Sequence, residues 1–181
     1  MTTTETDLAA ARYSSPVGTL SLVASSRGLR AILWPADGQG DQIDRVRLGK
    51  QIRRSTPVLD EAERQLDEYF AGARLAFDLV LDLRGTEFQR QVWMSLKDVG
   101  FGKTRTYGEQ AERLNRPTAT RAVAAANGRN PLSIVLPCHR IVGADGSLTG
   151  FAGGLETKAF LLDHEREVMG LEPKWRENRL F

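Results

Sequence analysis

The chain of 181 residues is poor in the residue types that build disulfides and metal sites: it has one cysteine, Cys138, and two histidines, His139 and His164. A single thiol excludes an internal disulfide and a thiolate-rich zinc site. The cysteine and the two histidines also lack the spacing of zinc ligands, because two of the three are adjacent. We therefore expect neither a metal nor a cofactor.

Long apolar runs are absent as well. No stretch of the sequence approaches the length of a membrane span, and residues 1–7 lack the basic and apolar regions of a signal peptide. We expect a cytoplasmic protein that does not bind membranes.

The chain has little net charge, since 25 basic residues face 23 acidic ones. The segment 101–140 differs, because its seven Lys and Arg residues outnumber its two Glu residues by five. Such an excess favours a polyanionic partner, although many basic segments are only solvated surface.

The first half of the sequence is typical of strands followed by a helix. Apolar runs at 19–24 and 29–34, separated by Ser25-Ser26-Arg27-Gly28, predict a β-hairpin. The elements expected after it are a polar loop over 35–54, a helix over 58–70 with Gly72 beyond its end, and a strand over 75–83.

At Leu83-Arg84-Gly85 the pattern changes to short helices. Thr86 with Gln89, and Thr106 with Glu109, are spaced as capping boxes that open two of them. Helices are expected over 86–99, 106–115 and 119–127, with Gly128 as a left-handed C-terminal cap. The last two, joined by a tight turn, are typical of a helix-turn-helix, but two helices packed in a core would show the same pattern.

The remaining expected elements are a strand over 133–136, a turn over 144–147, a glycine-rich loop over 149–154 and a helix over 155–169 that stops at Gly170. Together they predict an α+β fold. A small N-terminal sheet-and-helix domain would cover 1–83, a mainly helical DNA-binding and catalytic domain 84–169, and a C-terminal tail 170–181.

Cys138 follows one apolar run and, within Pro137-Cys138-His139-Arg140, precedes another. A free cysteine is most often a buried filler, and a redox sensor or a nucleophile are the alternatives. His139 is the obvious base, although neighbours in an extended strand point to opposite faces, so contact needs an irregular backbone or a bridging water. Glu165 is the candidate that orients His139, because it falls near the inward face of the last helix; a surface carboxylate fits that spacing equally well.

Residues 86–165 resemble the catalytic domain of the O6-alkylguanine-DNA alkyltransferases, also called methylated-DNA–protein-cysteine methyltransferases. The N-terminal part resembles this family's sheet-bearing domain only through Ser15-Pro16-Val17-Gly18-Thr19-Leu20. The matching motifs are, in chain order, Phe88-Gln89-Arg90-Gln91-Val92-Trp93, Thr106-Tyr107-Gly108, Thr120-Arg121-Ala122-Val123, Gly128-Arg129-Asn130-Pro131, Pro137-Cys138-His139-Arg140-Ile141-Val142-Gly143, and Gly153-Gly154-Leu155 leading to Leu161-Leu162-Asp163-His164-Glu165.

The resemblance implies a role for each matching residue. Cys138 would be the alkyl acceptor, His139 the water-mediated base and Glu165 the carboxylate that orients it. Asn130 would brace the turn before the cysteine, and Arg121 would take the place of a flipped guanine. The other residues implied to contact DNA are Tyr107, Ala119, Thr120, Ala122 and Arg129, and those implied to line the substrate pocket are Ile141, Phe151 and Ala152.

The activity implied by the resemblance is irreversible transfer of the methyl or other alkyl group of O6-alkylguanine to Cys138, once per molecule, with O4-alkylthymine as a further substrate. The partner would be double-stranded DNA, entered through the minor groove by a protein that is monomeric in solution, and cooperative binding along the duplex stays open. Phe151-Ala152 stands where many members carry Tyr-Ser, so two hydroxyl groups are absent here.

Two other functions compete with this interpretation. A non-reacting protein that binds alkylated lesions is disfavoured, because relatives of that kind replace the cysteine that this chain keeps. A cysteine hydrolase would need an oxyanion hole, and no feature of the sequence points to one.

Overall fold

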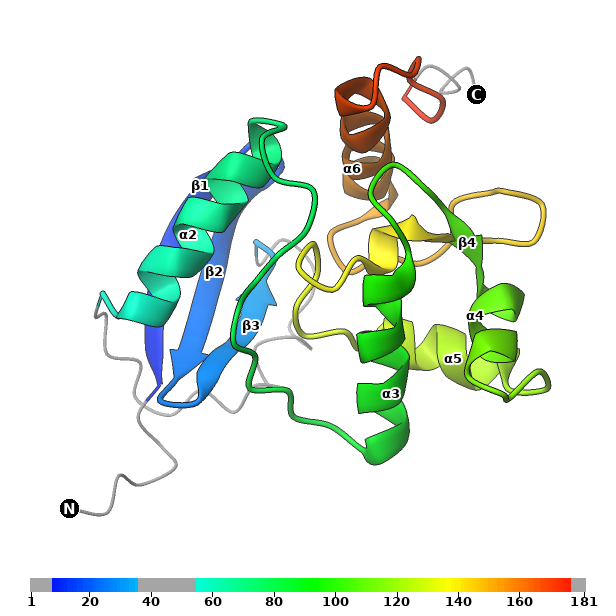
Figure 1. The fold of residues 1–181 in the computed structure, drawn as a ribbon, viewed down its shortest axis with the longest axis horizontal. Coiled ribbons are helices and arrows are strands. Elements are labelled where there is room, and N and C mark those ends of the chain that lie inside the picture. Colours follow the sequence, from blue (N-terminus) through cyan, green and yellow to red (C-terminus); the bar gives the residue numbers. More distant parts are fainter. Residues whose placement is uncertain (1–7, 36–54, 177–181) are drawn as a thin grey trace. The chain divides into compact units, whose positions relative to one another are not determined.

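The computed structural model describes residues 8–35 and 55–176, and the chain divides into two compact units, Met1–Arg84 and Gly85–Phe181 (Figure 1). The first unit holds a sheet and a helix, and the second holds mainly short helices. The predicted α+β class, with a sheet-bearing part before a helical one, is confirmed.

The first unit is built on an antiparallel sheet of three strands in the order β1 (Ala9–Ser15), β2 (Gly18–Ser25) and β3 (Gly28–Leu33). The predicted hairpin is the β2–β3 pair and is confirmed. Strand β1 has no clear sequence signal, because only Tyr13 of that strand is buried and its apolar residues do not alternate.

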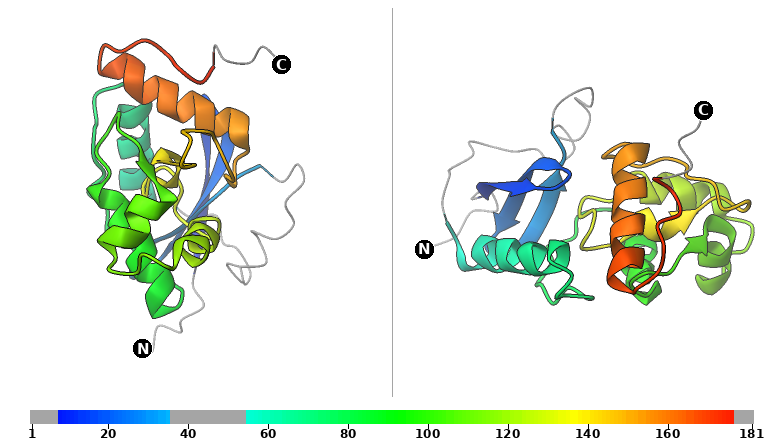
Figure 2. Two further views of the ribbon diagram at one scale, coloured as in Figure 1. Left: turned by 90° about the vertical axis from the view of Figure 1, so that its right-hand side faces the viewer. Right: turned by 90° about the horizontal axis from the view of Figure 1, so that it is seen from above.

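Helix α2 (Pro57–Phe70) lies along one face of this sheet (Figure 2). The Thr56 hydroxyl accepts the Leu59 N–H at its start, and Pro57 fits the first turn because no backbone donor is needed there. The side chains of Leu59, Leu66 and Tyr69 are fully buried on its inward face. The predicted helix over 58–70 is therefore confirmed to within one residue.

The predicted strand over 75–83 is wrong. Only Leu81 forms a bridge to the sheet, beside Leu29. Earlier in the segment the amide of Gln65 donates to the carbonyl of Asp78 and accepts its N–H, at 2.8 and 2.9 Å. A helix side chain thus satisfies the backbone groups that a neighbouring strand would take, and the segment joins the sheet only at the bridge of Leu81 beside Leu29. The predicted loop over 35–54 lies, apart from Pro35, outside the described residues.

The second unit begins with three helices, which are α3 (Glu87–Ser95), continued by the 3-10 turn η1 (Leu96–Asp98), then α4 (Tyr107–Arg113) and α5 (Thr120–Asn127). Both predicted capping boxes, at Thr86 and at Thr106, are formed. The helices meet through the buried side chains of Val92, Ala111, Val123 and Ala126. A helix pair joined by a short turn, α4 and α5, is therefore held on α3.

Gly128 does not form the predicted left-handed cap. Its φ of −62° and ψ of −16° are right-handed, and its N–H donates to the carbonyl of Ala124. The next two N–H groups, of Arg129 and Asn130, donate three residues back, so α5 tightens into successive turns instead of reversing.

The rest of the unit comprises the 3-10 turn η2 (Cys138–Arg140), strand β5 (Ile141–Val142), which pairs in parallel with β4 (Arg105–Thr106), and helix α6 (Leu155–Val168). Gly170 follows α6 with φ +74°, so the predicted end of this helix is confirmed. The chain then folds back, because the N–H groups of Lys174, Trp175 and Arg176 donate to the buried carboxylate of Asp163.

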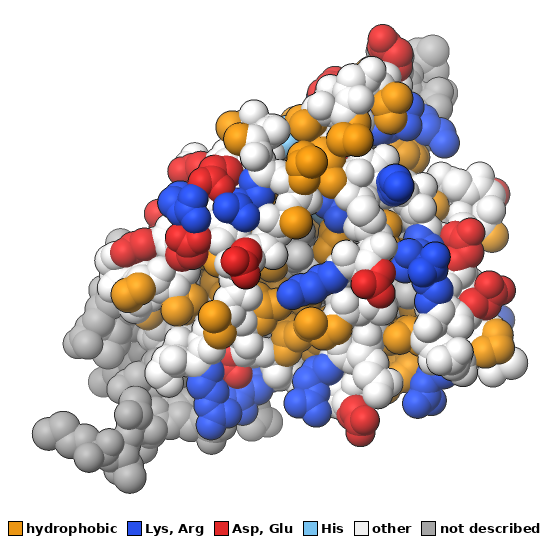
Figure 3. Space-filling view, viewed as in Figure 1, with side chains coloured by type: hydrophobic (Ala, Val, Ile, Leu, Met, Phe, Trp, Pro, Cys, Tyr) orange, Lys and Arg blue, Asp and Glu red, His pale blue; other side chains and the backbone are white. Residues whose placement is uncertain are grey.

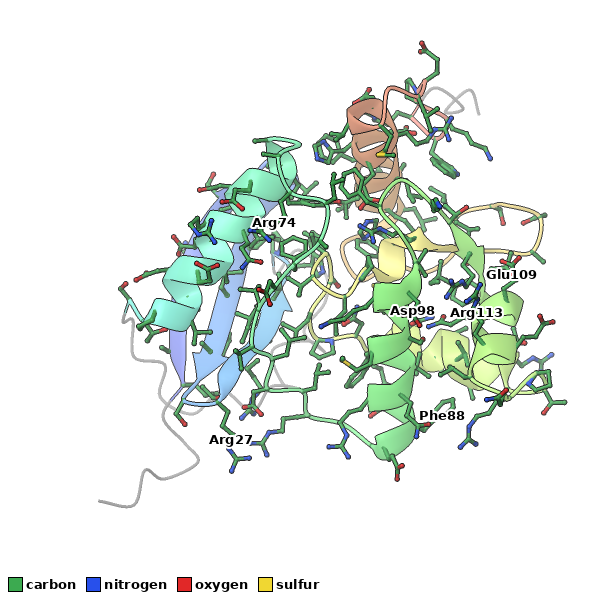
Figure 4. All side chains as sticks on the ribbon, in the orientation of Figure 1. Arg27, Arg74, Phe88, Asp98, Glu109 and Arg113 are labelled. Atoms are coloured by element: carbon green, nitrogen blue, oxygen red, sulfur yellow. The ribbon has the colours of Figure 1, made fainter. Side chains whose placement is uncertain are left out.

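Charged side chains gather where η1, β4 and α4 meet. Asp98, Glu109 and Arg113 lie close together there (Figure 4), and the guanidinium of Arg105 donates to the carbonyl of Asp98 at 3.2 Å.

Within residues 8–35 and 55–176 no helix has the length and apolar composition required to cross a bilayer.

Candidate active site

Cys138 is carried by a tight turn, and the predicted strand over 133–136 is wrong. A hydrogen bond of 2.8 Å, which the N–H of Leu136 donates to the carbonyl of Leu132, closes the turn. Ile134 within it has φ +75°, a strained conformation for a β-branched residue and one that a strand cannot contain. Asn130 holds both ends, since its amide donates to the Leu136 carbonyl at 2.7 Å and accepts the Leu132 N–H at 2.9 Å.

The turn leads directly into η2, whose three residues are all buried. The exposed fractions of Cys138, His139 and Arg140 are 8, 0 and 6 %. Because η2 is a 3-10 turn and not an extended strand, neighbouring side chains need not point to opposite faces. The irregular backbone that a Cys138–His139 pair requires is therefore present.

His139 is paired with Glu165, 26 residues further along the chain on α6. The Nε2 of His139 lies 2.7 Å from Oε1 of Glu165, and both side chains are fully buried. A carboxylate in this position favours the tautomer that carries its hydrogen on Nε2. Nδ1 of His139 has no hydrogen-bond partner in residues 8–35 and 55–176, so this nitrogen is available as a proton acceptor.

The carboxylate of Glu165 binds several donors at once. Arg140 donates from Nε to Oε2 and from Nη2 to Oε1, each at 2.9 Å, and the Gly102 N–H donates to Oε2 at 3.1 Å. Burial opposes the charge of this carboxylate, but His139 and Arg140 outweigh burial and lower the pKa of Glu165 to about 2. Glu165 is therefore ionised at neutral pH.

The thiol and the imidazole are both neutral at rest. Burial raises the pKa of the Cys138 thiol, although hydrogen bonds from Asn130 and Ser133 and the charge of Lys158 favour the thiolate. Burial lowers the pKa of His139 below its usual 6.5, despite the attraction of Glu165. A neutral imidazole therefore lies next in the chain to a neutral thiol, and a thiol must lose its proton before the sulfur can act as a nucleophile.

A loop over 149–154 covers this site and is tied to two helices. Tyr107, at the start of α4, donates from its hydroxyl to the carbonyl of Thr149 at 3.0 Å, and the buried ammonium of Lys158 on α6 donates to the same carbonyl at 2.9 Å. Burial lowers the pKa of Lys158 to about 8. Phe151 of this loop stands edge-on to His139, with 6.5 Å between ring centroids, so the loop closes over the base.

The other residues considered from the sequence fall into two places. Ile141 is fully buried beside η2 and Ala152 is half-buried in the loop. The candidate DNA contacts belong to α5 and its ends: Arg121, Ala122 and Arg129 are exposed, while Ala119 and Thr120 are partly buried at the N-terminus of the helix.

Arg140, Lys158 and Ser133 are the site residues that sequence reasoning missed. All three are buried. Only Ser133 lies inside an apolar run, between Leu132 and Ile134. Arg140 follows His139 and Lys158 follows Glu156-Thr157, so nothing in the sequence around these two charges indicates their burial. Asp163 is fully buried as well, where its carboxylate accepts the N–H of Arg176 in the tail. No group of three His, Cys, Asp or Glu side chains within residues 8–35 and 55–176 could hold a metal ion.

The sequence matches two known domains in the order found here. Residues 9–83 match the domain described as "6-O-methylguanine DNA methyltransferase, ribonuclease-like domain", and residues 87–167 match the "6-O-methylguanine DNA methyltransferase, DNA binding domain". The methylated-DNA–protein-cysteine methyltransferase of Methanosarcina acetivorans is 42% identical over 153 residues, which cover 84% of this chain and 95% of that protein. The chain belongs to the 6-O-methylguanine DNA methyltransferase family.

Other members of the family agree with this assignment. The methylated-DNA–protein-cysteine methyltransferase of Mycolicibacterium paratuberculosis is 56% identical over 105 residues, 58% of this chain and 64% of that protein. The crystal structure of Mycobacterium tuberculosis O6-methylguanine methyltransferase superposes with a TM-score of 0.77 at 38% identity, over 89% of this chain and 94% of that one. The same mycobacterial protein in complex with DNA gives a TM-score of 0.75, over 89% and 93% of the two chains.

Proposed function

We propose that the protein repairs DNA by direct reversal: it transfers the alkyl group of O6-alkylguanine irreversibly to Cys138, and each molecule acts once. The observation that carries the proposal is the buried arrangement of Cys138, His139 and Glu165 in a member of this family. The proposed site lies wholly in residues 84–169, and we propose that these residues form the DNA-binding and catalytic domain.

The reaction begins with removal of the thiol proton. Nδ1 of His139 accepts it through a bridging water, while the Nε2–H group of His139 keeps donating its hydrogen bond to the carboxylate of Glu165. The imidazolium that forms faces a carboxylate that is already ionised, and this lowers the free energy of proton transfer. Asn130, which braces the turn, also favours the thiolate.

The thiolate then attacks the alkyl carbon in line with its bond to O6. The S–C bond forms as the C–O6 bond breaks, the electron pair of that bond goes to the guanine oxygen, and the proton taken from the thiol ends on the guanine. A thioether has no easy route to hydrolysis, so the protein is consumed. The backbone N–H of Ala152 is the proposed donor to O6, and the carbonyls of Cys138 and Ile141 the proposed acceptors for the guanine amino group.

We propose that α5 enters the minor groove of the duplex. The exposed face of this helix carries the small side chains of Ala122 and Ala125. A narrow groove admits a helix backbone only where side chains are small. Arg121 is exposed on the same helix, directly before Ala122, and would fill the space of the extruded nucleotide. Arg129 and Tyr107 would contact the backbone of the same strand.

Two arginines, Arg121 on α5 and Arg129 just beyond its end, matter more for this proposal than the charge of the whole surface. In the view of Figure 3, Lys and Arg side chains are interspersed with Asp and Glu side chains and form no continuous basic area on that face. We therefore assign DNA binding to the residues of α5 and its ends, and we expect a protein that is monomeric in solution.

The test measures the DNA product. A duplex with one O6-methylguanine is incubated with the protein at several ratios, and restored guanine is quantified after digestion to nucleosides. The proposal predicts one guanine restored per protein molecule at most, and none with Cys138→Ser. Restoration beyond one equivalent would indicate turnover. Tight binding of the damaged duplex without restored guanine would instead support a lesion-binding protein that does not react.

A further inference from the structure

Arg140 is a buried cation that directly contacts the carboxylate of the proposed His139–Glu165 pair. It forms a two-pronged contact with Glu165, at 2.9 Å on each oxygen, and its Nη1 donates to the carbonyl of Val99 at 2.6 Å. The guanidinium also lies over the ring of Phe101, 5.6 Å from its centroid. A side chain held by so many contacts has a fixed position and cannot be a solvated surface charge.

The charges in this cluster balance only when His139 is neutral. Glu165 carries one negative charge and Arg140 one positive charge, so the buried cluster has no net charge around a neutral imidazole. Protonation of His139 would leave a buried net positive charge, which is costly in a low-dielectric interior. In a His–Glu pair without the arginine, the same protonation would be favourable, because the imidazolium would neutralise the carboxylate.

We propose that Arg140 is a positioning residue that keeps His139 neutral by neutralising Glu165, so that His139 can accept the proton of Cys138. This inference rests on the proposed function. Glu165 alone would fix the orientation of His139 but would also hold a proton on it. Arg140 leaves Glu165 its orienting role and offsets part of its attraction for the proton.

The groups that face His139, other than Glu165, either disfavour its protonation, as Arg140 does, or are uncharged. Helix α6 contributes Glu165 and the ammonium of Lys158, and the charge of Lys158 also disfavours an imidazolium. Turn η2 contributes Arg140 and the thiol of Cys138, and the loop over 149–154 contributes the uncharged ring of Phe151. Among these groups only Glu165 favours the protonated base, and Arg140 is the cation that contacts it.

The direct test is the titration of His139 by NMR of the imidazole nitrogens in the full-length protein. The chain has only two histidines, so a His164→Gln variant identifies the His139 signals. We expect wild-type His139 to be neutral at pH 7, with its hydrogen on Nε2 and a midpoint below about 6.5. An imidazolium at pH 7 in the wild type would overturn the proposal, whatever the variants do.

Two substitutions then separate charge from bracing. Arg140→Met removes the charge and should raise the midpoint of His139 by about one pH unit or more; Arg140→Lys keeps the charge and should leave it near the wild-type value. Arg166→Met is the matched control, because Arg166 follows Glu165 on α6 but contacts the carbonyl of Glu172 and the ring of Trp175. A midpoint in Arg140→Met equal to that of the control would contradict the inference.

The pH profile of Cys138 alkylation gives a second readout. One pH unit below the raised midpoint of His139, about one tenth of the imidazole is neutral, so the alkylation rate of Arg140→Met should be about tenfold lower than its own rate at alkaline pH. At alkaline pH its rate should approach that of Arg140→Lys. An equal loss at every pH would mean that Arg140 only braces the fold, and would overturn the inference. The NMR titration requires no DNA, so a wild type that fails to repair would refute the proposed function and leave the titration result independent.

Discussion

The contacts of Glu165 predict the effect of replacing it by glutamine. Glu165→Gln keeps the shape of the side chain and removes its charge. In the wild type the carboxylate accepts hydrogen bonds from His139, from two nitrogens of Arg140 and from the N–H of Gly102, and it donates none. An amide has one accepting end and one donating end, so one of these donors must face the new N–H₂ group.

One orientation of the glutamine disables the base, and the other breaks the buried ion pair. If the N–H₂ group faces His139, the imidazole must accept at Nε2 and carry its hydrogen on Nδ1, where it can no longer take the thiol proton. If the N–H₂ group faces Arg140, a buried cation loses its partner. We expect the alkylation rate to fall by about 10³-fold or more, as in hydrolase triads whose base is held in the wrong tautomer.

The same change should destabilise the fold, since removing one partner of a buried ion pair costs roughly 3–5 kcal/mol. For a chain of this size that corresponds to a fall in Tm of roughly 10 °C. Glu167→Gln is the matched control, because Glu167 lies on the same helix and is exposed. The assay is single-turnover alkylation by duplex O6-methylguanine, with Tm from circular dichroism. A rate for Glu165→Gln within threefold of the control would refute this reasoning.

Three further predictions concern bracing, DNA contact and acid stability. Asn130→Ala removes two buried hydrogen bonds of the cysteine turn and should cost about 2–3 kcal/mol in denaturant unfolding; a cost below 0.5 kcal/mol would contradict the bracing role. Arg121→Ala should leave Tm unchanged and abolish repair of duplex DNA while sparing reaction with the free base O6-methylguanine, whereas the exposed Arg27→Ala in the β2–β3 turn should repair normally (Figure 4). Folding lowers the pKa of Glu165 from 4.5 to about 2. The ionised carboxylate therefore contributes roughly 3 kcal/mol to the free energy of unfolding above pH 4.5, and this contribution is lost as the pH falls towards 2. Acid unfolding of Glu165→Gln should lack that loss.

Local sequence signals predicted the helices well and the irregular segments poorly. The capping boxes at Thr86 and Thr106 are short-range hydrogen-bond patterns, so the sequence contains all the information needed to place them. The segment 133–136 is as apolar as a strand, but the amide of Asn130 closes it into a turn through contacts that composition does not reveal. The same holds for 75–83, where Gln65 on α2 takes the place of a partner strand.

The site itself was predictable only in part. Cys138, His139 and Glu165 could be named as candidates from the residues themselves, and the resemblance to a family implied their roles. The structure brings His139 and Glu165 into contact across 26 residues. Arg140 was counted from the sequence only as one of several positive charges. Its role depends on a carboxylate 25 residues away and on a backbone carbonyl 41 residues away, and no local pattern encodes such distances.

The central claim is that Cys138 receives the alkyl group and keeps it. The most direct measurement is peptide mass mapping of the protein after incubation with an excess of duplex DNA that contains O6-methylguanine. The account predicts one added methyl group, on the peptide that contains Cys138, with no second addition after longer incubation and none in Cys138→Ser. A methyl group on any other residue, or an unmodified Cys138 beside repaired DNA, would contradict it.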